Sequence, residues 1–264
     1  MSRRPSRVGS SPRSVSSLLI ASCILLFYIP ASTAQPSDPA SRDARFAEAD
    51  RLYADRADLS SARRAADIWN AALTVDARDF EAAWRLARAD YWLGGHGPEA
   101  ERRKDLERGI DAGRKAAAAQ PSRPEGHFWI AANMGALAES FGLRQGIKYR
   151  KPIKESLETV LRLDPAFMDG SADRALGRWY FKVPGMFGGD RKLSEAHLRK
   201  SLTYNPVSTA SLFFLGELLE DEGRKAEARA EYQAVIDAPV NPNWAAEDQE
   251  FKEKARRAMP GAKK

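Results

Sequence analysis

Three histidines are the residues best suited to acid-base chemistry or metal binding, and their surroundings support neither role. His96, His127 and His197 are far apart, and no two share a helical turn. The acids nearest to the last two, Glu125 and Glu195, lie two residues back, where helical side chains do not face each other. Metal sites and general acid-base pairs need convergent groups. We therefore predict no metal site and no catalytic histidine.

Nucleophilic and phosphate-binding motifs give no stronger signal. The Gly-x-Ser-x-Gly pattern of serine hydrolases is missing from the sequence, and no carboxylate pair stands out among the 36 acids. Glycine-rich turns at a helix N-terminus can cradle phosphate, which singles out Gly185 and Gly188-Gly189, but no Lys-Ser or Lys-Thr follows as a P-loop requires. We expect these glycines to allow positive φ angles and Asp190 to cap the next helix. We predict neither an enzyme nor a cofactor site.

The excess of positive charge is concentrated at the start of the chain. The 264 residues include 42 basic and 36 acidic side chains, a net charge of +6. Four of the arginines lie in the first 34 residues, where there is no acid, which leaves 38 basic against 36 acidic residues in the remainder. Nucleic-acid-binding proteins usually carry a basic face or stripe. The balanced remainder gives no reason to expect nucleic acid as a partner.

Residues 1–34 have the order of a secretory signal peptide that resembles a bacterial one. An arginine-bearing start precedes an apolar run from Leu18 to Ile29, which is too short for a comfortable membrane span, and Ser32-Thr33-Ala34 provides a small-residue exit. We expect cleavage after Ala34, a periplasmic or secreted protein with no transmembrane span, and a short disordered lead-in over residues 35–40.

Cys23 provides the alternative to simple secretion. Ile20-Ala21-Ser22-Cys23 fits a lipobox, in which the cysteine is lipidated and anchors the protein to a membrane, although the apolar run continues past this cysteine. Cys23 is the only cysteine, so cleavage after Ala34 leaves none for disulfides or metal binding.

From Ser41 onward, apolar residues recur at helical spacing and are interrupted periodically. The interruptions are stops whose last residues are 44, 44, 41 and 33 positions apart: Val75-Asp76-Ala77, Gln120-Pro121, Leu163-Asp164-Pro165, Tyr204-Asn205-Pro206 and Ala238-Pro239. This periodicity is typical of a solenoid, in which each helical hairpin buries its apolar face on its neighbours.

Two sets of positions recur with the stops. The helix before each stop has three residues at spacings of four and three, on one helical face: Ala65/Trp69/Ala72, Gly109/Gly113/Ala116, Ile153/Leu157/Val160, Ser194/Leu198/Ser201 and Ala228/Tyr232/Val235. The preceding helix supplies Trp84 with Tyr91, Leu176-Gly177 with Tyr180, and Leu215-Gly216 with Leu219. Together these positions resemble tetratricopeptide (TPR) repeats.

The resemblance implies an all-α fold. We expect a right-handed superhelical stack of about five TPR-like hairpins over residues 41–259, with a C-terminal capping helix from Trp244 to Met259 and a flexible tail over 260–264. Residues 209–240 match the 34-residue template without gaps, whereas the three preceding hairpins are longer by about seven to ten residues. The excess must lie in longer helices or in the turns at 94–98, 142–146 and 184–189.

The resemblance also selects a binding surface, because the first helix of each TPR hairpin lines the concave face. The matching positions mix aromatic side chains with cations: Trp92, His127, Arg174, Arg178, Phe181, Phe213 and Glu217, with Arg85, Ile130 and Met134 beside them. Asn133 lies in an apolar stretch of the sequence. We therefore expect its side chain to form either a buried hydrogen bond across hairpins or a contact in a pocket. Such a surface could bind a ligand, because aromatic rings provide contact area and arginine pairs with carboxylates. The alternative interpretation is that the aromatic residues only fill gaps between the hairpins.

These features lead to two hypotheses for function. The first is an exported scaffold whose concave face binds a protein or peptide partner in the cell envelope. A narrower resemblance over about 120–206 is to the TatT-type periplasmic TPR components of TRAP transporters, and Phe187-Gly188-Gly189-Asp190, Ala196-His197-Leu198 and Ser201-Leu202 carry it. It implies the second hypothesis, a solute-binding accessory that holds a small apolar organic acid near Arg174 and Arg178.

Overall fold

The computed structural model describes residues 39–259, which belong to one compact unit. This range contains eleven α-helices, two short 3-10 helices and no strand. They are α1 Pro39–Ala54, α2 Leu59–Val75, α3 Phe80–His96, α4 Glu99–Ala119, α5 Pro124–Phe141, α6 Leu143–Leu163, α7 Phe167–Lys182, η1 Gly185–Phe187, α8 Arg191–Tyr204, α9 Thr209–Asp221, α10 Lys225–Asp237, η2 Pro242–Trp244 and α11 Ala245–Ala258. The predicted leader, its Cys23 and the tail over residues 260–264 lie outside the described residues. None of the helices described has the length and apolar character needed to cross a bilayer.

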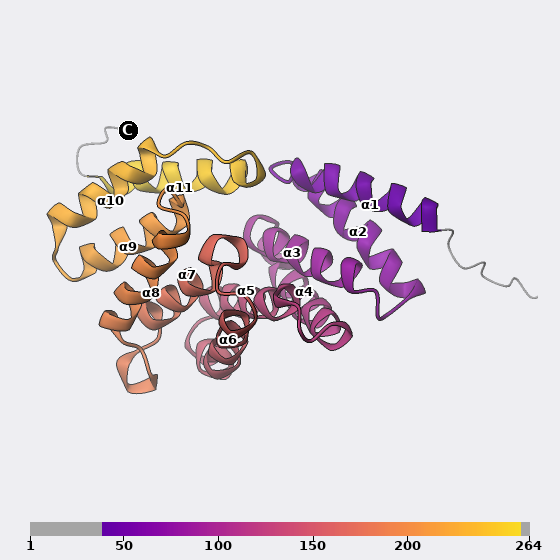
Figure 1. The fold of residues 1–264 in the computed structure, drawn as a ribbon, viewed down its shortest axis with the longest axis horizontal. Helices are drawn as coiled ribbons and strands as arrows, with labels where there is room; N and C mark the ends of the chain where they lie inside the picture. Colours follow the sequence, from indigo (N-terminus) through magenta and orange to yellow (C-terminus); the bar gives the residue numbers. More distant parts are fainter. Residues whose placement is uncertain (1–38, 260–264) are drawn as a thin grey trace, which may run out of the picture. The chain divides into compact units, whose positions relative to one another are not determined.

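The helices pack as a stack of hairpins. Each of α1 to α9 packs against the next helix in the chain, and the first helices of successive hairpins also meet, since α3 packs against α5, α5 against α7, and α7 against α9 (Figure 1). α11 packs against α9 and α10 at the end of the stack. The predicted all-α architecture of five hairpins and a terminal helix is confirmed.

Local signals set the helix boundaries. The carboxylates of Asp58, Asp79 and Asp190 accept hydrogen bonds from backbone amides two or three residues further on and cap α2, α3 and α8. Such caps satisfy amides that have no partner inside the helix. At the other end, α6 stops at Asp164, because Pro165 disfavours helical geometry in the residue before it.

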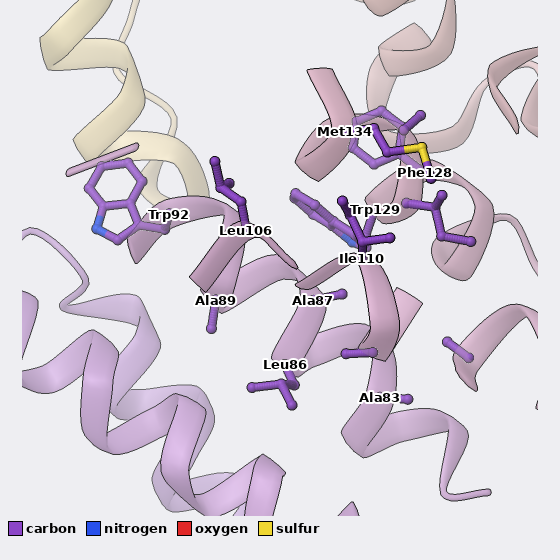
Figure 2. Close-up of a cluster of buried hydrophobic side chains, with 14 of the residues drawn as sticks. Ala83, Leu86, Ala87, Ala89, Trp92, Leu106, Ile110, Phe128, Trp129 and Met134 are labelled. Atoms are coloured by element: carbon purple, nitrogen blue, oxygen red, sulfur yellow. The ribbon is translucent and has the colours of Figure 1, made fainter. Parts of the chain in front are cut away.

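The helical faces predicted from the residue triplets are buried. Trp69 and Leu198 have no exposed surface, and Gly113 of α4 lets the backbone of α5 approach so closely that a Cβ there would lie 2.8 Å from the Ile130 side chain. Figure 2 shows the core where Leu106 and Ile110 of α4 meet apolar side chains from α3 and α5. Small residues at these crossings therefore set how closely the hairpins pack.

The excess length of the middle hairpins has two origins. α4 and α6 each extend over 21 residues, whereas α8 and α10 have 14 and 13. In the fourth hairpin the excess forms the connection from Val183 to Asp190, which includes η1. There a Cβ on Gly189 would lie 1.7 Å from the Val183 carbonyl oxygen, so only glycine fits where this loop folds back.

Candidate functional site

A cavity of about 1100 Å³ lies among α3, α5, α6, α7, α9 and α11. Its walls come mainly from the first helices of successive hairpins, which is the arrangement that the repeat pattern predicts for a concave face. Pockets for small ligands usually have volumes of about 300–1,000 Å³. The cavity is therefore at the upper end of the usual size for a ligand pocket.

Aromatic rings from six of the α-helices line this cavity. The Tyr91 and Trp129 rings are 5.7 Å apart between centroids, and those of Phe214 and Phe251 are 5.5 Å apart. Trp179, on α7, also lines the cavity. Its indole nitrogen donates a hydrogen bond to the Arg150 carbonyl at 2.9 Å. Rings in such pairs provide large, rigid contact area at low entropic cost.

Arg174 is the cationic side chain that distinguishes the cavity. It lies on α7 and is partly buried, and no residue within 39–259 forms a hydrogen bond or ion pair with it. Burial lowers the pKa of Arg174, and the neighbouring Tyr91 and Asp169 oppose that effect. A guanidinium keeps its charge at neutral pH. A partly desolvated cation without a partner is a site for an anionic group of a ligand.

Arg178, one turn further along α7, is already neutralised. Its Nε and Nη2 donate to the carboxylate of Glu139 on α5 at 2.8 and 3.0 Å, and its Nη1 donates to Glu217 on α9 at 2.9 Å. These acids lie 39 residues before and after it, at equivalent places on the neighbouring hairpins. Arg178 thus connects three hairpins and is less available to a ligand than Arg174.

Three of the five acidic side chains that line the cavity pair with cations, whereas Asp169 and Asp248 accept hydrogen bonds from neutral groups. The pairs are Glu139 with Arg178, Asp169 with Asn205, Glu247 with Arg56, Asp248 with Thr209, and Glu250 with His96 and Lys254. Arg102 and Arg150, by contrast, donate to the backbone carbonyls of Gly94 and Ile147, and no carboxylate in the described range pairs with them. Together with Arg174, these guanidiniums have no carboxylate partner within residues 39–259, and they can attract an anionic group.

Contacts of the α1–α2 loop and of the end of α3 with η2 and α11 border one side of the cavity. Arg56, in the loop between α1 and α2, is 3% exposed; it pairs with Glu247 and donates to the Asn243 carbonyl at 3.0 Å. His96 Nε2 lies 3.1 Å from Glu250. We call these four charged residues, Arg56, His96, Glu247 and Glu250, the terminal junction. Figure 1 shows this loop beside the start of α11.

The start of α7 is an unusual part of the cavity wall. Met168 and Asp169 have φ angles of 47° and 57°, in the left-handed region that non-glycine residues rarely adopt, and Gly170 follows at 72°. Such conformations cost on the order of 1–3 kcal/mol each and often occur at functional sites. The bend lies one turn before Arg174 and turns Met168 and Asp169 toward the cavity.

The structure distributes the residues predicted for binding over several environments. Trp92, Arg174 and Arg178 line the cavity. His127 lies in a smaller depression with Ile130 and Met134, where its Nε2 is 3.0 Å from the Pro121 carbonyl. Asn133 is fully buried and donates to the Ala87 and Trp129 carbonyls, which is the buried hydrogen bond across hairpins.

The remaining predicted residues lie beside the cavity. Phe213 is 9% exposed and packs on Tyr232 and Phe251 in the core. Phe181 packs against the same core, under the Arg191 guanidinium at 5.3 Å. Glu217 reaches the site through its bond to Arg178.

Sequence reasoning missed the neighbour of one selected residue. The cavity wall includes Phe214, one residue after the selected Phe213. One residue turns a helix by about 100°, so a one-residue error in register exchanges a wall position for a core position. Phe251 of α11 was missed as well, and the TPR template has no position for it.

No group of residues in the described range has the composition and proximity of a metal site. His197 is paired instead with Asp173 across its hairpin, at 2.7 Å, and stacks on Tyr180. Asp190 caps α8, so the Gly188-Gly189 turn has a structural explanation.

The stacked hairpins and their aromatic concave face define a TPR-type helical repeat protein. The structure is similar to TTC0263, a thermophilic TPR protein in Thermus thermophilus, with a TM-score of 0.62 and 21% identity over 82% of this chain and 98% of that one. It is also similar to pilF of Pseudomonas aeruginosa, with a TM-score of 0.50 and 16% identity over 83% and 94% of the two chains. These likenesses confirm the predicted superhelical TPR-type fold.

The sequence itself identifies a family. The family model described as Regulator of microtubule dynamics protein 1-3 matches residues 45–204, and the chain belongs to that family. No curated protein matches the sequence.

Proposed function

We propose that this protein is an exported, non-enzymatic scaffold whose cavity binds an extended segment of a protein partner in the cell envelope. The observation that carries the proposal is a large concave cavity that combines aromatic rings from successive hairpins with the guanidinium of Arg174, which has no partner within residues 39–259. Aromatic side chains contact an extended chain over a long distance, while arginine takes a carboxylate in a bidentate pair. From the family we take the fold and not the role in microtubule dynamics that its name describes.

The size of the cavity favours a peptide segment. A volume of about 1100 Å³ is at the upper end of the range for ligand pockets, and the aromatic pairs at Tyr91 and at Phe214 come from hairpins that are not adjacent in the chain. A compact ligand would contact one pair, whereas an extended segment contacts both.

Site-specific photo-crosslinking in intact cells tests this proposal. A photoreactive phenylalanine analogue at Tyr91 or Phe214 is expected to capture the same envelope protein, and the variant Arg174→Gln is expected to reduce capture about ten-fold, since a desolvated charged hydrogen bond contributes about 1.5–3 kcal/mol. Val75, which is 70% exposed and outside the cavity, is the control position. Equal adducts from Val75, or none from either cavity position, would refute the proposal.

A small apolar acid is the second candidate, because the free guanidinium of Arg174 suits a carboxylate flanked by rings. Native mass spectrometry of the purified protein is expected to show a bound acid, and adding aromatic and branched-chain monocarboxylic acids is expected to raise the melting temperature of the wild type but not of Arg174→Gln. A protein that stays empty and is not stabilised by any of these acids would exclude this candidate.

A further inference from the structure

The first half of α6 carries a run of basic residues without an acid. Residues 142–154 contain no Asp or Glu and include Arg144, Lys148, Arg150, Lys151 and Lys154. Arg144 and Lys148 are exposed, and neither has an ion-pair partner within residues 39–259. Lys151 and Lys154 pair at 3.6 and 3.7 Å with acids one turn further along the same helix. This part of the surface therefore has a local positive charge that the nearly balanced chain as a whole does not show.

Exposed apolar side chains lie beside these cations. Leu143 is 66% exposed and Ile147 is 37% exposed, and their spacing of four places them on one stripe of α6. Met186, in η1, is 85% exposed. The loop that carries it is held against α6, since the Arg150 guanidinium lies 5.6 Å from the Phe187 ring centroid. Three large apolar side chains thus face water around one basic helical segment.

The buried face of α6 fixes this arrangement in the fold. Tyr149, Ile153 and Leu157 are 8%, 7% and 1% exposed and belong to the core. The helix therefore presents its basic and apolar stripes without any rearrangement of the hairpin.

We propose that this surface, formed by Leu143, Arg144, Ile147, Lys148 and Met186, docks on an anionic lipid surface. Helices that lie at the membrane interface combine Lys and Arg on one side with apolar side chains that enter the headgroup region, and anionic lipids attract the cations. Protein interfaces, by contrast, are depleted of lysine. This inference goes beyond partner binding in the cavity and does not depend on it. Because Leu143 and Ile147 also line the cavity, docking places its mouth at the lipid surface.

Vesicle co-sedimentation tests the inference with the chain from Gln35 onward, which includes the whole compact unit and lacks the apolar leader. We expect the protein to sediment with vesicles of phosphatidylglycerol and phosphatidylcholine in equal parts, and not with phosphatidylcholine alone. The double variant Arg144→Glu/Lys148→Glu and, separately, Leu143→Gln/Met186→Gln are each expected to weaken binding at least about ten-fold. Added salt is expected to release the wild type.

A matched control and a rival ligand make the result decisive. Lys104→Glu/Lys115→Glu reverses two exposed charges on α4 and is expected to bind as the wild type does. We expect all variants to keep the melting temperature of the wild type in circular dichroism, because none of the changed residues is buried. Vesicle binding that survives the α6 charge reversal overturns the inference. The inference is also overturned if the protein does not bind anionic vesicles but binds poly-glutamate through Arg144 and Lys148. That result would indicate an acidic protein partner instead.

Discussion

At the scale of single residues, Arg174 and Arg178 lie one helical turn apart on α7 and differ in their partners. Arg178 satisfies two carboxylates from neighbouring hairpins, whereas Arg174 has no partner among the residues described. We expect Arg178→Gln to lower the free energy of unfolding by about 1–2 kcal/mol, because it leaves two partly exposed carboxylates without their cation. Arg174→Gln is expected to leave it nearly unchanged. Urea unfolding followed by circular dichroism measures both effects.

A double-mutant cycle separates the ion pair from simple loss of packing. If Arg178 acts through Glu139, the combined variant Arg178→Gln/Glu139→Gln loses less stability than the sum of the single variants. Equal losses for Arg174→Gln and Arg178→Gln would contradict the distinction between the two arginines.

The sequence predicted Trp92, Arg174 and Arg178 as binding residues, and all three line the cavity. The sequence could not distinguish the different environments of the two arginines. The partners of Arg178 lie 39 residues away in both directions, and His197 pairs with Asp173 on another helix. Periodicity identifies equivalent positions on successive hairpins, while the direction of each side chain depends on exact helix register. For this reason the pattern selected Phe213 where the cavity uses Phe214.

At the scale of helices, two glycines of α5 make a matched pair. A Cβ on Gly126 would lie 2.5 Å from the Ala117 backbone nitrogen, whereas a Cβ on Gly135 would meet nothing within 4 Å. We expect Gly126→Ala to destabilise the protein by about 1–3 kcal/mol, because α4 and α5 would have to separate. Gly135→Ala is expected to stabilise it by up to about 1 kcal/mol through helix propensity. The midpoints of urea unfolding report both, and a loss at Gly135 as large as that at Gly126 would refute the packing argument.

The number of helices and the ends of the second helix of each hairpin were predictable because their causes are local. The Asp-Pro stop at Asp164 and the cap at Asp190 act within a few residues, and the predicted capping helix from Trp244 matches α11 within one residue. The extra residues of the middle hairpins were not assignable, since apolar spacing alone does not say whether an insertion lengthens a helix, as in α4, or forms a loop, as around η1.

At the scale of the whole described unit, the terminal junction connects parts of the chain that no repeat pattern relates. Arg56 and Glu247 are 191 residues apart in the sequence, and His96 and Glu250 are 154 apart. Solenoids are stabilised mainly by contacts between neighbouring repeats, so these contacts add a constraint that the hairpins alone lack.

The junction is expected to depend on pH through His96 and Glu250. Burial alone would lower the pKa of His96, but its hydrogen bonds to Glu250 and to the Trp92 carbonyl outweigh burial and raise the pKa above the ordinary 6.5, with Glu247 adding to the effect. The hydrogen bond from His96, opposed by burial and assisted by Lys254, lowers the pKa of Glu250 to about 2. Arg56, the remaining charge of the junction, stays protonated throughout.

The signs of these shifts define the pH window. The raised pKa of His96 contributes stability that is complete below the ordinary value of 6.5, and this stability is lost as the pH rises through the pKa in the folded protein. The lowered pKa of Glu250 contributes stability that is complete above the ordinary value of 4.5, and this stability is lost as the pH falls through about 2. The junction is thus most stable between about pH 4.5 and pH 6.5. We expect the stability gap between the wild type and His96→Gln to be largest near pH 5 and to shrink toward pH 9 in urea unfolding. His127→Gln is the control, because His127 lies against a backbone carbonyl and not a carboxylate. A gap for His96→Gln that stays constant over this range would show that the ring stacked on Trp92, and not its charge, holds the junction together.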